Sequence, residues 1–327
     1  MKYSSNELIK FYEQMVLGRK YEEKVMSLVN QGKLQGFFHL SIGQEAAQVG
    51  VVSAMGPNDY LVPTHRFHTG LVNRMDMKDM TCELLGRITG CNKGKAFTFH
   101  ISSKKDRILS VNGMLGAGVP NAVGYAWTLK MNKQEGVVVC VFGDGASSEG
   151  DVHEAMNLAT IHKIPIVFFI ENNGWAVSTP LSTQAAVENL SVRAKAYNMP
   201  GVTVDGDDVI KVNEAMKEAI ALARNGQPSI VEAKTHRWRG HFEGDPAMYR
   251  DANEIEEAKK NCPIKRLEKM LLDKKLLSPE QIEEIVNTVQ NELEEVFTYA
   301  MGCPLPTKEQ TLDYDQVYAS NLGGDLW

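Results

Sequence analysis

The chain has 327 residues, a formal net charge of -6 at pH 7, 43% hydrophobic residues and 23% charged residues. These proportions are typical of a soluble globular protein with a sizeable core, and the acidic balance argues against nucleic acid or an anionic membrane as a main partner. No run approaches the roughly 20 apolar residues of a membrane span, and the charged N-terminus lacks the apolar centre of a signal peptide.

The N-terminal segment, residues 1–35, predicts a helix that begins near Ser5. Its apolar residues recur at helical spacing and would form one buried face: Leu8, Phe11, Tyr12, Met15 and Val16. Residues 36–135 follow with short helical patterns and with loops rich in glycine and histidine.

Residues 136–240 alternate apolar strands with amphipathic helices. The strands are predicted at 136–142, 164–170, 201–204 and 228–235, and the helices at 151–163, 183–197 and 210–226. Strands that alternate with helices of this length predict an α/β fold, with a mostly parallel sheet covered by helices on both faces.

The C-terminal part carries two charged helical patterns over residues 251–300, split near Ser278-Pro279, and ends in an irregular tail. We expect a helical appendage and an arm that docks on a partner. The chain is therefore divided into an N-terminal helical segment (1–35), an α/β domain (36–250) and C-terminal helices with a docking tail (251–327).

The five cysteines are scattered and none has C-x-x-C spacing. This usage predicts reduced thiols in a cytoplasmic protein, not a disulfide framework or a zinc site. Cys140 lies inside an apolar strand, so we interpret it as a core residue.

Polar residues follow two consecutive strands at the point where each strand ends. Gly143-Asp144-Gly145 follows the first, and Glu171-Asn172-Asn173 follows the second after one helical crossover. Parallel neighbours lie about 4.8 Å apart, so Asp144 and Asn173 should meet at the sheet edge where ligands bind in α/β folds. A carboxylate, an amide oxygen and a nearby main-chain carbonyl are ligands that Mg²⁺ prefers, with the rest supplied by water and phosphates. Either motif alone is more often a simple turn; their joint placement favours a metal and diphosphate site.

A second group combines loop histidines with arginines in "HRFH" and "RWRGH". The planar guanidinium of arginine pairs well with phosphate oxygens. Histidine can donate or accept a proton near neutral pH. His39, His65, His68 and His241 are the candidates; for His68 a structural role weighs as much as a functional one.

The spacing Gly-Asp-Gly, 26 residues, Asn-Asn resembles the thiamine diphosphate motif. The flanking sequence is similar to the alpha subunit of thiamine diphosphate-dependent dehydrogenases. These enzymes act on 2-oxo acids or acetoin within lipoyl-containing multienzyme complexes. The similarity extends over most of the chain and is carried by "GKLQGFFHLSIGQEA", "THRFHTG", "ELLGRITG", "GMLGAGVPNAVG", "VDGDD" and "THRWRGHFEGDPAMYR". The fold it implies is the thiamine diphosphate-binding fold.

The resemblance implies a set of site residues. Magnesium would be bound by Asp144, Asn173 and the main-chain carbonyl of Trp175. Positions on the cofactor would be Arg66, Gly145 and Ala146 at the diphosphate, Gly113 and Leu115 at the pyrimidine, and in addition His65 and His241. The catalytic candidates are His241, which would orient or protonate the substrate, with His39 and His68.

The chain departs from the pyruvate-specific pattern. His65 stands where a tyrosine is usual, His236 replaces another tyrosine, and Phe242 stands where animal relatives have a regulatory serine, so we expect no phosphorylation there. "KAFTFH" replaces a glycine-rich "GGSMH" stretch and changes the pocket. "THR" and "RWRGHFEGDP" are forms associated with acetoin dehydrogenases. Acetoin is the favoured substrate; pyruvate and branched-chain 2-oxo acids remain alternatives.

The resemblance also implies partners. The glutamate that activates the cofactor belongs to a beta subunit in this family, and no motif for it stands in this chain. We expect a heterotetramer of two alpha and two beta chains that passes an acyl group to a lipoyl domain, with no nucleic-acid or membrane partner. The rivals are a transketolase-like enzyme, against which "GQEA" argues, and a non-catalytic scaffold or regulatory subunit with a retained cofactor fold.

Overall fold

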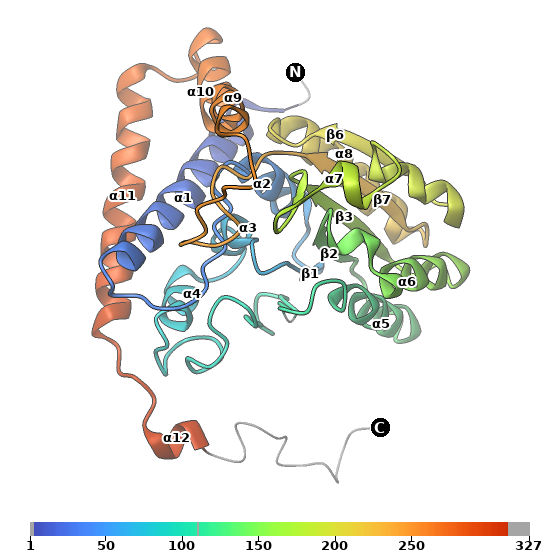
Figure 1. Ribbon diagram of the computed structural model, residues 1–327, viewed down its shortest axis with the longest axis horizontal. Coiled ribbons are helices and arrows are strands. Elements are labelled where there is room, and N and C mark those ends of the chain that lie inside the picture. Colours follow the sequence, from blue (N-terminus) through green and yellow to red (C-terminus); the bar gives the residue numbers. More distant parts are fainter. Residues whose placement is uncertain (1–2, 110, 313–327) are drawn as a thin grey trace.

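The central feature of the computed structural model, which describes residues 3–109 and 111–312, is a five-stranded parallel sheet. The strands stand in the order β1-β2-β3-β7-β6 (Figure 1). Their bounds are β1 Tyr60–Val62, β2 Val138–Gly143, β3 Ile166–Asn172, β6 Gly201–Asp205 and β7 Ser229–Lys234. The strands predicted from residue 136 onward are confirmed, and β1 is an additional edge strand.

Helices cover both faces of the sheet, as predicted. Alternate residues of a strand point to opposite faces, so Val139 and Phe169 enter one hydrophobic cluster while Cys140 and Phe168 enter another. The first cluster includes α1, α2 and α8, and the second includes α5 and α6 (Figure 1). These helices are α1 Ser5–Asn30, α2 Glu45–Ala54, α5 Gly118–Met131, α6 Gly150–Ile161 and α8 Val209–Arg224. Cys140 is thus a core residue.

The N-terminal helix packs against helices from the C-terminal part of the chain. The predicted apolar face of α1 is buried, and α11 contacts both α1 and α4. Three helices follow the sheet where two helical patterns were expected: α9 Ala252–Lys260, α10 Pro263–Asp273 and α11 Pro279–Gly302. Ser278 begins α11 with a capping box, which explains the break predicted there. Leu267 and Phe297 belong to the same core cluster as the sheet residue Val139.

The helix predicted over 183–197 is wrong. The segment forms one short turn, α7 Leu181–Gln184, and later a 3₁₀ helix, η2 Leu190–Tyr197. The buried carboxylate of Glu232 on β7 accepts the backbone N–H of Ser191 at 3.0 Å and the Thr203 hydroxyl at 2.7 Å. This tertiary hydrogen bond takes a backbone donor that a continuous α-helix would pair internally.

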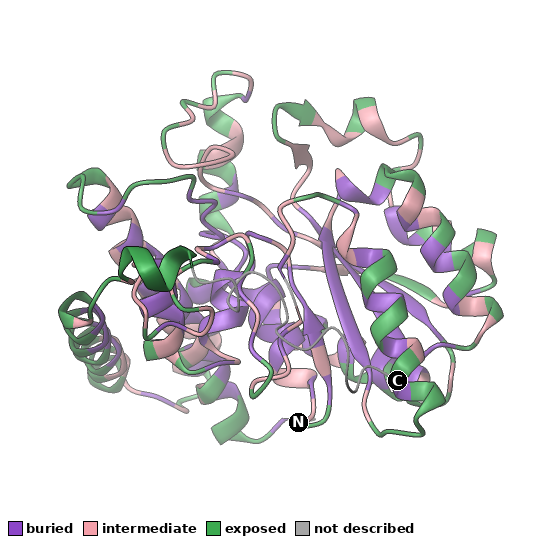
Figure 2. Cartoon of the chain, turned by 90° about the horizontal axis from the view of Figure 1, so that it is seen from below, coloured by how far each residue is buried: buried purple, intermediate pink, exposed green. Residues whose placement is uncertain are grey.

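Loops and short elements gather at the carboxyl edge of the sheet. The short elements are α3 His68–Val72, α4 Met77–Leu84, η1 Ala146–Ser148, β4 Trp175–Ala176 and β5 Thr179–Pro180. Burial concentrates in the sheet and the helices that flank it, while the outer faces of the helices are exposed (Figure 2). Beyond α11 lies α12 Lys308–Leu312, and the rest of the predicted docking tail, 313–327, lies outside the described residues. No helix of the described part is long and apolar enough to cross a bilayer.

Candidate functional site

A pocket of about 810 Å³, measured to its open mouth, lies at the carboxyl ends of β1, β2 and β3. Strand-end residues Val62, Gly143 and Glu171 line it. The edge beyond the carboxyl ends of parallel strands is where α/β folds bind ligands. Predicted site residues line it as follows: His65, Arg66, Leu115, Asp144, Gly145, Ala146, Asn173, Trp175 and His241.

Asp144 forms an acidic wall of this pocket. Its side chain is buried, with 1% exposure, and accepts a hydrogen bond from Gln184 Nε2 at 2.9 Å. Gly143 pairs with Glu171 in the parallel register of β2 and β3, so the residues that follow both strands emerge side by side. Burial raises the pKa of Asp144 to about 6, and hydrogen bonds from backbone N–H groups, including that of Asn173, oppose the rise. A bound cation would remove this cost of burying a carboxylate.

Asn173 stands beside Asp144 with its amide held in one orientation. Its Nδ2 donates to Gln44 Oε1 at 3.0 Å, so its Oδ1 is free to accept, and it accepts the backbone N–H of Trp175 at 3.2 Å. The indole of Trp175 is anchored in turn by Glu254 Oε1 at 3.0 Å. The wall therefore presents a carboxylate, an amide oxygen and a main-chain carbonyl region, which are the hard oxygen ligands of Mg²⁺.

Arg66 and Arg237 also line the pocket and form its cationic wall. The guanidinium of Arg66 is buried and donates to the carbonyl oxygens of Leu40 at 2.9 Å and His241 at 2.7 Å. Burial, and then the charge of Arg237, lower the pKa of Arg66 to about 9, so it is still charged at neutral pH. Arg237 is anchored by the carbonyl of Val177 at 3.1 Å and the Tyr249 hydroxyl at 3.0 Å. Two guanidinium groups facing one pocket favour an anion such as a diphosphate.

The tautomer of His241 follows from its contact with Arg66. Nη2 of Arg66 lies 3.2 Å from His241 Nδ1. Because a guanidinium only donates, Nδ1 must accept and the ring proton must sit on Nε2. Burial lowers the pKa of His241 to about 4, so the ring is neutral at pH 7. Asp245 accepts the backbone N–H of His241 at 2.6 Å and holds its loop in place. His241 is thus a neutral N–H donor suited to a carbonyl oxygen.

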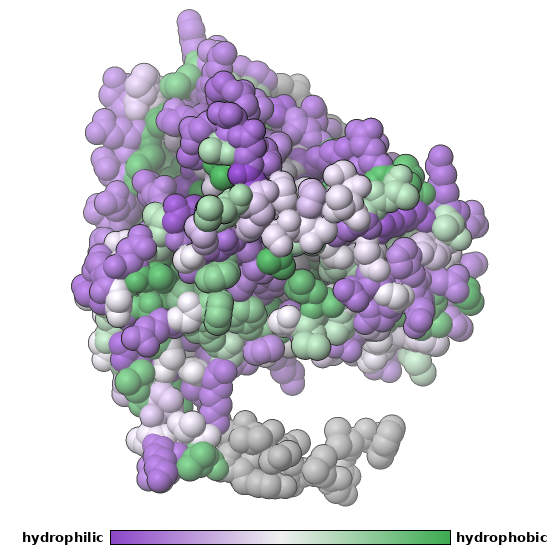
Figure 3. Space-filling model, in the orientation of Figure 1, coloured by the Kyte–Doolittle hydropathy of each residue, from purple (hydrophilic) through white to green (hydrophobic). Residues whose placement is uncertain are grey.

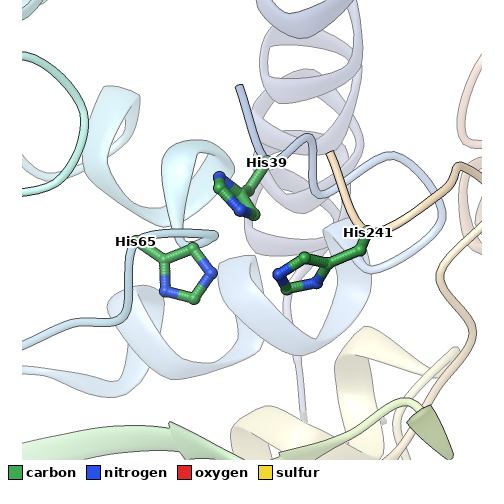
Figure 4. A group of neighbouring side chains, drawn as sticks. All are labelled: His39, His65 and His241. Carbon is green, nitrogen blue, oxygen red and sulfur yellow. The ribbon is translucent and has the colours of Figure 1, made fainter. Parts of the chain in front are cut away.

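Three histidines from distant segments converge here. One ring nitrogen of each of His39, His65 and His241 lies within 4.8 Å of the others, and the rings point toward one another (Figure 4). Burial lowers the pKa of His39 to about 3 and that of His65 well below its usual range, so both are neutral. Neutral imidazoles are metal ligands in general, but the charged Arg66 against His241 disfavours a cation. We interpret the cluster as a neutral polar surface.

Three predicted residues lie outside the pocket lining: His39, which is described above, His68 and Gly113. His68 is buried on α3, and its Nδ1 lies 2.9 Å from Glu22 Oε1. The other oxygen of Glu22 accepts the backbone N–H of Ser41 at 2.5 Å, so this pair holds the loop that carries His39. Gly113 lies against Phe99, whose ring a Cβ at that position would approach at 3.2 Å.

Sequence reasoning missed the residues that orient the site. Gln48 Nε2 donates at 3.0 Å both to the carbonyl oxygen of Arg66 and to the carboxylate of Glu171. Burial raises the pKa of Glu171 to about 8. Gln44, four residues earlier on the same helical segment, orients Asn173. The available signal was this pair of glutamines in the motif "GQEAAQ", one helical turn apart. Gln184 and Arg237 gave no comparable signal, because their contacts depend on loop geometry.

Oxygen ligands on one wall and guanidinium groups on the other fit a diphosphate bound together with a divalent cation. A further polar atom is free to take part, since Gln44 Nε2 is buried without a hydrogen-bond partner. Buried polar atoms are rarely left unpaired unless water or a ligand satisfies them.

Comparisons with known proteins show the family to which the chain belongs. The family model described as "Dehydrogenase E1 component" matches residues 13–309. The alpha subunit of acetoin:2,6-dichlorophenolindophenol oxidoreductase from Bacillus subtilis is 38% identical over 96% of this chain and 94% of its own length. Pyruvate dehydrogenase E1 component subunit alpha is 33% identical in Porphyra purpurea, over 97% of this chain and 94% of that protein. The Zymomonas mobilis protein of the same name is 36% identical over 93% and 87%.

Proposed function

Because the chain belongs to the dehydrogenase E1 component family, we propose that it is an alpha subunit that binds thiamine diphosphate and Mg²⁺ in the pocket described above, cleaves acetoin and passes the acyl group to a lipoyl domain. One observation carries the proposal. The buried Asp144 and the oriented Asn173 follow neighbouring parallel strands and line the same pocket as Arg66.

The cofactor would be held by residues of both walls. Asp144, Asn173 and the Trp175 carbonyl would bind the cation, and Arg66 with His65, Gly145 and Ala146 would surround the diphosphate. Gly113 and Leu115 would face the pyrimidine. Once bound, thiamine diphosphate supplies the carbanion chemistry that breaks a carbon–carbon bond beside a carbonyl, and the protein supplies position and charge.

The histidines of this chain would form hydrogen bonds with the substrate oxygen and donate or accept its proton. His241 donates from Nε2, and its position is fixed by Arg66 on one side and by Asp245 on the other. His39 lies beside it, with ring centroids 4.7 Å apart. Neutral donors of this kind orient a carbonyl without an ionised group that a buried site would have to solvate. We expect His68 to act only through Glu22 and the Ser41 backbone.

The proposed partner is a beta subunit, which would complete the site with the cofactor-activating glutamate that the family resemblance assigns to that subunit. Support comes from apolar side chains at the mouth of the pocket: Met114 is 72% exposed, and Leu115 and Val177 are each 47% exposed. Apolar surface gathers across the region between α4 and α5 (Figure 3). Exposed apolar side chains around the mouth of a pocket are typical of a protein interaction site.

Acetoin is the proposed substrate, with pyruvate or a branched-chain 2-oxo acid as the alternative. The "THR" and "RWRGHFEGDP" forms support acetoin, and the Bacillus subtilis relative is named for it. His65, in place of a tyrosine, stacks on Phe99 at 5.7 Å between ring centroids, so one side of the pocket is an aromatic wall. The test is a substrate panel on the reconstituted alpha–beta pair with a dye acceptor; faster turnover of pyruvate than of acetoin would reject the preference.

The need for a partner is tested with the isolated chain. With thiamine diphosphate and Mg²⁺ it should show no turnover, and activity should appear on addition of the beta subunit. Robust turnover by the chain alone would contradict the shared site. Calorimetry addresses the scaffold alternative: absence of cofactor binding by the alpha–beta pair would favour a non-catalytic subunit.

A further inference from the structure

Two cysteines from distant parts of the chain meet at one surface. Cys82 lies on α4 and Cys303 ends α11, 221 residues later, yet their sulfurs are 3.9 Å apart. Both are free thiols. A disulfide requires about 2.05 Å between sulfurs, together with a specific dihedral angle. The two sulfurs must therefore approach each other by about 1.9 Å to form the bond.

The two thiols differ in access and acidity. Cys303 is partly exposed, and its pKa is lowered by a hydrogen bond with the Thr89 hydroxyl, by Cys82 and Tyr299, and by the charge of Arg87. Cys82 is 1% exposed, and burial raises its pKa. A reactive, accessible cysteine beside a protected second thiol is the arrangement of a redox-sensitive pair.

The other three cysteines lack this arrangement. Cys140 is enclosed in the sheet. The thiol of Cys91 donates to Asn92 Oδ1 at 3.2 Å, and burial raises its pKa to about 12. Cys262 precedes α10 and packs against the core. Oxidation should therefore be selective for one pair.

We propose that Cys82 and Cys303 form a reversible disulfide when the protein meets a small-molecule disulfide, and that this bond fastens the end of α11 to α4. The Cys303 thiolate attacks one sulfur of the oxidant, whose S–S bond breaks and releases one thiolate. Cys82 then loses its proton to solvent and attacks Cys303 Sγ, which expels the second thiolate. Two electrons pass from the protein thiols to the oxidant, which leaves as two thiols.

The disulfide would restrain a part of the molecule that extends to the candidate site: the end of α11, α4 and the loop that follows α4. Without it, the end of α11 is held here by hydrogen bonds such as Ile88 N–H to the Pro304 carbonyl at 3.0 Å. Glu83, next to Cys82, accepts backbone N–H groups of the following loop: Asn92 at 2.7 Å, Gly94 at 3.0 Å and Ala96 at 2.6 Å. Phe99, three residues further on, lies 5.1 Å from His39 between ring centroids.

Oxidised glutathione is the probe. The full chain is treated with it and then unfolded in urea at low pH, remaining thiols are blocked with N-ethylmaleimide in the denaturant, and intact mass and non-reduced peptide maps are recorded. Of the five cysteines, two should escape alkylation, leaving three blocked, and one peptide pair should link Cys82 to Cys303. Dithiothreitol should restore five. Amide hydrogen exchange of residues 86–96 and 300–304 should slow several-fold in the oxidised form.

Matched variants decide the outcome. In Cys82→Ser the reaction should stop at a glutathione adduct on Cys303. Cys303→Ser should form neither the adduct nor the crosslink at this place. Cys262→Ser, the control, should still form the crosslink. Glutathione adducts alone on the wild-type chain, or a crosslink between other cysteines, would overturn the pairing. A crosslink that leaves hydrogen exchange unchanged would overturn the fastening.

Discussion

The two walls of the pocket are built in different ways. The acidic wall rests on regular structure: β2 and β3 run side by side with Gly143 paired to Glu171, and Asp144 and Asn173 follow directly after these two strands. The cationic wall rests on loops, with Arg66 and His241 brought together by hydrogen bonds across 175 residues of sequence. A strand-borne residue is placed by the backbone ladder, whereas a loop-borne residue depends on side-chain contacts that a single substitution can remove. The four variants below test that difference.

Removing the carboxylate of the acidic wall should have the largest effect. Asp144→Ala should weaken Mg²⁺-dependent thiamine diphosphate binding by more than about 100-fold, because a cation ligand is lost. The circular dichroism spectrum should stay near that of the wild type, since the strands position this residue. Calorimetry on the alpha–beta pair measures the affinity. Asp79→Ala, a surface acid paired with Lys105, is the control; retained cofactor affinity in Asp144→Ala would reject the metal site.

The cationic wall is tested with Arg66→Met. Loss of a charge-assisted contact should weaken diphosphate binding roughly 10- to 100-fold, because such hydrogen bonds contribute about 1.5–3 kcal/mol. His241 should also lose its fixed tautomer, so kcat of the alpha–beta pair should fall in addition to the affinity. Arg266→Met, which removes a surface ion pair with Asp205, is the matched control. Equal effects of the two variants would deny Arg66 a place at the ligand.

Loop support is tested with Glu22→Gln. The buried carboxylate of Glu22 holds Ser41 N–H and His68 together, so the amide should cost about 1–3 kcal/mol of unfolding free energy. Urea titration measures the loss. Glu23→Gln, on the exposed side of α1 beside Lys20, should change stability by less than about 0.5 kcal/mol. A kcat decrease without a stability change would instead mean that Glu22 acts on the chemistry directly.

The smallest effect is expected at His236, which directly precedes Arg237 of the cationic wall. The hydrogen bond to Asp207 raises the pKa of His236, so the pair stabilises the protein below the unfolded pKa of about 6.5 and loses that contribution as pH rises through the raised value. The His236 side chain is 44% exposed, which limits the contribution to about 1 kcal/mol or less. Asp207→Asn should narrow the stability difference between pH 5 and pH 9 in urea titrations; an unchanged difference would contradict the pairing.

Much of the fold was predictable from periodicity. Apolar runs and amphipathic helices marked the sheet from residue 136 onward, and Ser278-Pro279 marked the start of α11. The prediction over 183–197 was wrong because Glu232, on a strand later in the chain, captures the Ser191 amide. Local helix propensity gives no information about a backbone N–H that donates its hydrogen bond to a buried carboxylate far away in the sequence.

By itself, the sequence determined which strands end in Asp144 and Asn173, and that one crossover separates them, because parallel strands align their carboxyl ends at one edge. The family followed from motifs along the chain. Only the tertiary structure decided that Gln44 and Gln184 orient those two residues, that Arg66 fixes the tautomer of His241, and that His68 supports a loop. Cys82 and Cys303 meet for the same reason. Contacts between segments far apart in the chain depend on how loops and helix ends pack, and neither residue spacing nor periodicity encodes that packing.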